Sequence, residues 1–105
     1  MSVQEMHNDA GVLTGFEVRN AGVSRRRACR VAASVPGARV TRAPRLFRSW
    51  SEDFCAFEVD GVSFLIIEPF GDSSRYWIVA EDPNSTAGPL IERVRSTFAA
   101  AWGWP

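Results

Sequence analysis

The stretch that decides the fold runs from Phe54 to Ile67 and reads FCAFEVDGVSFLII. Two runs of strand-forming residues flank Asp60-Gly61, which is the strongest two-residue signal for a β-hairpin. The register that this turn sets pairs three apolar residues of the first strand with three of the second. The pairs are Val59 with Val62, Phe57 with Phe64, and Cys55 with Ile66. These side chains predict one apolar face on an antiparallel pair.

Downstream of the hairpin, the sequence predicts one more strand and a closing helix. Pro69 ends the second strand because proline lacks the N–H that a ladder needs, and residues 75–81 (RYWIVAE) then complete a three-stranded meander. A helix is expected from Thr86 or Pro89 to Trp102. Its apolar stripe comprises Leu90, Ile91, Val94, Phe98, Ala101 and Trp102. This spacing is that of one helix face.

Upstream of the hairpin, a short strand over 12–18 precedes a helix whose apolar stripe is Ala28, Val31, Ala32 and Val35. Two residues compete as its N-cap. Ser24 would place three arginines in the first turn, against the helix dipole, at about 0.3–1 kcal/mol each. Asn20 moves them beyond that turn, so we favour Asn20. Pro36-Gly37 ends the helix.

The remaining segments complete an α+β fold. Residues 1–10 predict a flexible tail, and residues 38–51 predict one or two edge strands, around Arg39–Arg42 and Leu46–Trp50, because Pro44 excludes a central strand. We expect a single domain over residues 11–105. Its antiparallel sheet of four to five strands has the order β-α-β-β-β-β-α, with both helices packed on one face.

The charges are unevenly distributed along the chain. All twelve basic residues are arginine, and twelve acids balance them. Residues 1–50 carry nine of the arginines, whereas residues 51–105 carry nine of the acids. The arginine bias is typical of a GC-rich genome, and the alternative is selection for bidentate contacts. This segregation is typical of a protein with a basic or an acidic binding surface. The alternative is that the two halves of the chain fold together, so that their charges interleave on the surface.

Chemical motifs are scarce. Cys29 and Cys55 are the only cysteines, and with no secretory signal we expect reduced, partly buried thiols and no stabilising disulfide. The single histidine, His7, supports neither a catalytic triad nor a zinc site. Nucleotide-binding and hydrolase motifs are lacking. We therefore expect no enzyme, no metal and no cofactor. A small carboxylate-based enzyme using Glu68 and Asp72 is the remaining catalytic alternative.

One segment, residues 68–82, gathers acids, an arginine and aromatics at the ends of predicted strands. Such residues anchor protein interfaces. The candidate partner-binding residues are Glu68, Asp72, Arg75, Tyr76, Glu81 and Asp82. The competing interpretation is an Asx turn closed by Asp72, in which Arg75 pairs with Glu68 across the hairpin and Trp77 lies in the core. Trp102 and Trp104 have two possible roles: they pack into the core, or they contact a partner at an interface.

These features favour a non-catalytic protein-binding module, such as an immunity or antitoxin protein that neutralises a toxin or effector, including a basic nuclease. The alternative is a nucleic-acid-binding domain using the arginine-rich segment 19–48. The order helix, three strands, helix loosely resembles a double-stranded-RNA-binding domain, but Pro89-Leu-Ile-Glu92 stands where that family has basic residues. Zero net charge also disfavours nucleic acid. We expect a cytoplasmic protein that does not enter membranes.

Overall fold

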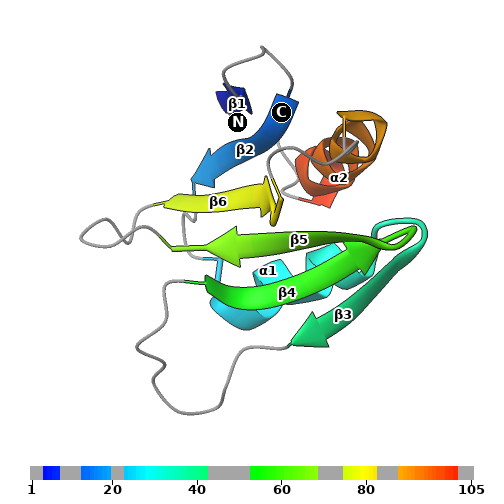
Figure 1. Ribbon diagram of the computed structural model, residues 1–105. Coiled ribbons are helices and arrows are strands. Elements are labelled where there is room, and N and C mark those ends of the chain that lie inside the picture. The colour runs from blue at the N-terminus through cyan, green and yellow to red at the C-terminus, as the bar shows by residue number, and fades with distance from the viewer. Residues whose placement is uncertain are drawn as a thin grey trace.

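The computed structural model describes residues 4–7, 13–19, 23–42, 53–68, 75–82 and 88–101. These residues form a six-stranded sheet and two helices (Figure 1), which confirms the predicted α+β class. The strands are β1 Gln4–His7, β2 Leu13–Arg19, β3 Ala38–Arg42, β4 Asp53–Val59, β5 Val62–Ile67 and β6 Arg75–Ala80. The helices are α1 Arg25–Ala33 and α2 Gly88–Ala101.

The hairpin that the sequence predicts forms the fourth and fifth strands of this sheet, so neither of its strands is at an edge. Strand order is β1-β2-β6-β5-β4-β3, and every neighbouring pair is antiparallel. All three predicted pairs across the hairpin are present in β4 and β5. Asp60 and Gly61 have φ values of 49° and 84°, the positive angles that a type I′ turn requires at both positions.

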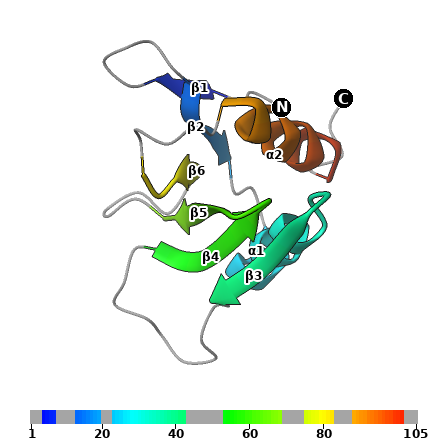
Figure 2. The same ribbon diagram turned by 45° about the vertical axis from the view of Figure 1, so that its right-hand side comes forward.

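Both helices pack on one face of the sheet (Figure 2) and enclose the core with it. Alternate residues of β2, β4, β5 and β6 supply the sheet side, and Phe16 of β2 meets Phe98 of α2 edge to face at 5.7 Å. Three residues of the predicted α2 stripe, Ile91, Val94 and Phe98, are fully buried. This burial is the main stabilising contribution to the fold.

The N-terminus and the first helix differ from the prediction. Residues 4–7 were expected within a tail, but they form β1 and pair with the outer edge of β2. The sequence of β1 lacks the apolar alternation that would predict a strand. This segment becomes a strand because the outer edge of β2 offers unpaired N–H and C=O groups with which it can pair. The N-cap prediction of Asn20 is also wrong: α1 starts after Ser24, whose Oγ accepts a hydrogen bond from the Arg27 N–H at 3.1 Å.

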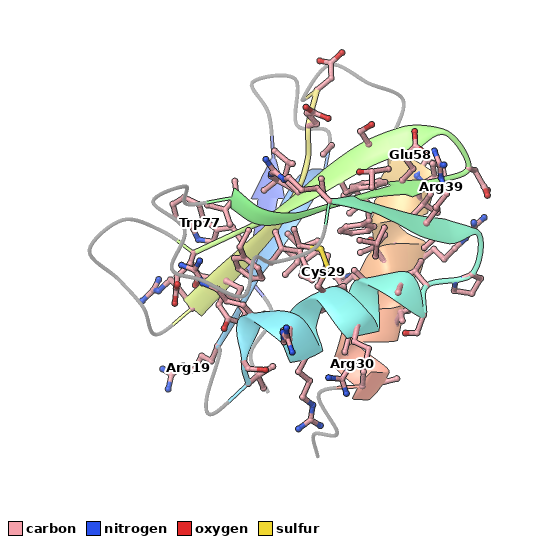
Figure 3. The ribbon with its side chains drawn as sticks, turned by 90° about the horizontal axis from the view of Figure 1, so that it is seen from below. Arg19, Cys29, Arg30, Arg39, Glu58 and Trp77 are labelled. Carbon is pink, nitrogen blue, oxygen red and sulfur yellow. A yellow bond between two sulfur atoms is a disulfide. The ribbon has the colours of Figure 1, made fainter. Side chains whose placement is uncertain are left out.

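The two cysteines are joined, so the prediction of reduced thiols is wrong. Cys29 of α1 and Cys55 of β4 form a disulfide with a Cα–Cα distance of 5.8 Å (Figure 3). Residue 29 belongs to the face of α1 that packs on the sheet, and residue 55 points toward the helices from β4. The partners lie 26 residues apart, so their meeting depends on tertiary packing, which spacing alone does not reveal.

Some predictions fall outside the described residues. These are the strand at Leu46–Trp50, Asp72, and the roles of Trp102 and Trp104. The other predicted edge strand is observed as β3, at the margin of the sheet. Neither helix in the described part of the chain is long and apolar enough to cross a membrane.

Candidate functional site

The structure does not bring the candidate binding residues together at one place. Glu68 follows β5 and Arg75 begins β6, so these two residues lie at the same end of the sheet. Glu81 and Asp82 follow the other end of β6, about 20 Å away for a strand of six residues. Both are exposed, and the Glu81 N–H donates a hydrogen bond to the Ser63 carbonyl at 2.9 Å.

Glu68 holds helix α1 to the sheet. Its Oε1 accepts hydrogen bonds from Nε of Arg25 at 3.0 Å and from an Nη of the same guanidinium at 2.5 Å. That guanidinium lies 5.0 Å from the centre of the Phe54 ring, a cation–π contact. The Glu68 side chain is only 18% exposed. Its negative charge is therefore neutralised by Arg25 within the molecule, so Glu68 contributes little electrostatic attraction to a basic partner.

Tyr76 belongs to the core. It is 3% exposed, its ring meets Phe54 edge to face at 5.1 Å, and its hydroxyl donates to the Val23 carbonyl at 2.7 Å. The hydrogen bond fixes the backbone just before the first turn of α1. The roles predicted for the two neighbouring aromatics are therefore wrong: Tyr76, expected at the interface, is buried, and Trp77, which the competing interpretation placed in the core, is partly exposed.

Arg75 and Trp77 share an acceptor that sequence reasoning missed. Glu17 of β2 accepts from an Nη of Arg75 at 3.0 Å and from the indole Nε1 of Trp77 at 2.9 Å, through the same oxygen. The β2–β6 pairing places Glu17 directly opposite Trp77. This pairing joins segments about 60 residues apart, so only the fold reveals it.

Trp77 lies on the face of the sheet opposite the helices, and Figure 3 shows it pointing away from α1. Apolar side chains of three adjacent strands are partly exposed there and do not belong to the core cluster. We call this set the open sheet face: Ala56, Leu65, Ile67, Trp77 and Val79. They are contiguous, because the ladder pairs Ala56 with Leu65, Leu65 with Val79, and Ile67 with Trp77.

The charges bordering the open sheet face are neutralised locally. Arg75 pairs with Glu17 on one side, and Arg39 of β3 pairs with Glu58 of β4 at 2.6 Å on the other. Among the described residues, neither helix covers this face, and no group of three potential metal ligands occurs. The surface is therefore apolar at its centre and electrically balanced at its margins.

Comparison with known proteins identified no relative of this chain. No protein-family model matches the chain, and neither a curated protein nor a solved structure matches it.

Proposed function

We propose that this protein is a non-catalytic protein-binding domain of the inhibitor type, as immunity and antitoxin proteins are, and that its open sheet face contacts the partner. The observation that carries the proposal is the contiguous, partly exposed apolar surface centred on Leu65 and Trp77. Large exposed apolar patches on soluble domains mark interaction sites. Tryptophan and arginine, here Trp77 and Arg75, are the residue types that most often dominate binding energy.

The partner that fits this surface presents an apolar, uncharged patch. Because Glu17 and Glu58 are already paired with arginines, the margins of the face attract neither strongly basic nor strongly acidic groups. The expected acidic interface for a basic nuclease has less support, since Glu68 is also paired. The proposal therefore keeps a protein partner and replaces charge with apolar contact as the basis of recognition.

The disulfide bears on where the protein acts. Structural disulfides persist in oxidising compartments and are rare in the cytosol. Cys29 and Cys55 are both buried, so their bond serves the fold. The proposal accordingly places the protein in an oxidising compartment, in contrast to the cytoplasmic expectation. Acid quenching of native cells, alkylation under denaturing conditions and mass measurement test this, because unfolding exposes both buried cysteines. Unmodified cysteines support it, and two alkylated cysteines contradict it.

The binding surface is tested by crosslinking and then by affinity. A photoreactive amino acid replaces Leu65 in one protein and, as a matched control, the exposed Ala99 of α2 in another. The partner crosslinked in native-host extract through position 65 is then purified, and its affinity is measured by calorimetry. Trp77→Ala should weaken binding by about 30-fold or more, the size of an interface hot spot. Ala99→Gln should leave the affinity unchanged.

Circular dichroism establishes that Trp77→Ala remains folded, and Leu65→Gln provides a second variant that keeps the Trp77–Glu17 hydrogen bond. Equal affinity of the parent and both folded open-face variants would show that the partner binds elsewhere. The proposed inhibitory role requires a further result: the parent protein lowers the partner's own activity, and Trp77→Ala relieves that effect.

A further inference from the structure

Three arginines on α1 form a second exposed surface, which we call the arginine face: Arg26, Arg27 and Arg30. Figure 3 shows Arg30 projecting from the side of α1 away from the sheet. All three side chains are exposed, and within the described part of the chain none of them pairs with a carboxylate. By contrast, Glu17, Glu58, Glu68 and Asp60 each pair with an arginine.

The arginine face opposes the stability of its own helix. Arg26 and Arg27 lie in the first turn, where the helix dipole is positive, and no acidic residue lies in that turn. Arg30 is one turn further along, at the i+4 and i+3 positions from Arg26 and Arg27, so like charges are neighbours on the helix surface. Arg30 itself lies in the last turn, where the dipole favours a cation. The unfavourable effects are therefore the position of Arg26 and Arg27 in the first turn and the repulsion among the three charges, and no described carboxylate relieves them.

Nothing in the packing of α1 requires these three side chains. The helix contacts the core through Ala28, Cys29 and Ala32, and the disulfide ties it to β4. Arg25, which precedes the arginine face, makes the ion pair with Glu68 that anchors the start of the helix. Arg26 and Arg27 thus carry an electrostatic penalty that no packing contact of α1 explains, and such breaks in local rules concentrate at functional sites.

We infer that the arginine face of α1 binds an acidic segment of a protein. Guanidinium groups match carboxylates with two parallel hydrogen bonds. Arginines three and four positions apart have Cβ atoms about 5–6 Å apart. This spacing is close to the roughly 6.6–6.8 Å between alternate residues of an extended strand. An extended segment with carboxylates at alternate positions therefore matches the arginine face.

Nucleic acid fits the arginine face less well. The helix has nine residues and spans about 13–14 Å, and its unpaired charge is three. Proteins that hold duplexes through the backbone commonly neutralise about six to ten phosphates. The net charge of the whole chain is zero, and α1 carries no aromatic residue on which a base would stack. Carboxylates on one short protein segment match the available charge.

This inference is independent of the proposed function. The arginine face lies on the helix side of the sheet, and the open sheet face lies on the other side. The probe is a fluorescein-labelled oligoglutamate peptide, whose binding to the oxidised chain of 105 residues is measured by anisotropy at low and at physiological salt. A short DNA duplex with the same label serves as the competing probe.

The test variant is Arg26→Gln with Arg30→Gln. Its matched control is Arg39→Gln with Arg95→Gln, which removes the same charge from arginines that already pair with Glu58 and Glu92. At low salt, the test variant should bind oligoglutamate about tenfold more weakly than the parent, as expected for two exposed charge pairs. The control should retain parental affinity. Added salt should weaken parental binding, because exposed pairs are screened.

Thermal unfolding separates a binding role from a structural one. The test variant should melt at or above the parental temperature, since it removes repulsion within α1. A clearly lower melting temperature than that of the control would show that the arginines stabilise the fold, and the inference would be wrong. Equal loss of peptide affinity in both variants, or no peptide binding by the parent, would overturn it as well. Tighter, Arg26- and Arg30-dependent binding of the duplex would assign the surface to nucleic acid.

Discussion

Reduction of the Cys29–Cys55 disulfide should destabilise this protein substantially. The bond closes a loop across a sequence separation of 26 residues, which includes β3. The chain-entropy relation for such a loop gives about 12 cal/mol/K, or about 3.5 kcal/mol at 25 °C. The total stability of domains is about 5–15 kcal/mol, so this single bond represents a large fraction of it.

The expected change in melting temperature follows from the size of the chain. Unfolding entropies of about 2.1 cal/mol/K per residue give about 0.22 kcal/mol/K for 105 residues. A loss of 3.5 kcal/mol then lowers the melting temperature by about 16 °C. The reduced state keeps every atom of the side chains, so the comparison is free of the cavity that a cysteine substitution would leave.

The assay is thermal unfolding followed by circular dichroism, with and without excess phosphine reductant. Mass measurement after alkylation establishes that the reduced sample carries two free thiols. Cys29→Ala with Cys55→Ala serves as a control that should melt well below the oxidised parent and show no response to reductant. An unchanged melting temperature in protein with two demonstrated free thiols would refute the reasoning.

Three further substitutions test the fold. Gly15→Ala should destabilise by about 1–3 kcal/mol in urea unfolding, because its Cβ would lie 2.6 Å from the Ile78 carbonyl oxygen. Gly61→Val should also cost about 1–3 kcal/mol by the same measurement, since φ is +84° although no atom lies within 4 Å of the added Cβ; parental stability would contradict the type I′ turn. Tyr76→Phe should cost about 1–2 kcal/mol by leaving the Val23 carbonyl without its donor, and faster amide exchange at the start of α1 should accompany the loss.

The elements closest to Asp60-Gly61 were predictable from sequence because their determinants are local. The turn residues, the alternation of Phe57 and Val59, and the period of the α2 stripe act within a few positions of one another. The structure confirms the register of the hairpin and the class of the fold. These features depend on short-range sterics and on burial of one face, which sequence patterns record directly.

Features that depend on pairing between distant segments were not predictable in this way. Strand β1 depends on the free edge of β2, and the disulfide depends on where α1 lies over β4. The grouping of residues 68–82 into one site neglected the length of β6. Arg75 begins β6 and Glu81 directly follows its end. The two residues are therefore separated by the length of the strand, about 20 Å for six residues.

The wrong prediction of the N-cap of α1 bears on the proposed role of the arginine face. Asn20 was favoured because Ser24 would place Arg25, Arg26 and Arg27 at the positive end of the helix dipole, and Ser24 is nevertheless the cap. The electrostatic cost remains, and burial of Ala28 and Ala32 together with the disulfide offsets it for the helix as a whole. A paired carboxylate can also relieve the cost at a single arginine. Glu68 does so for Arg25. For Arg26 and Arg27 no described group does, and an acidic partner would remove the penalty on binding.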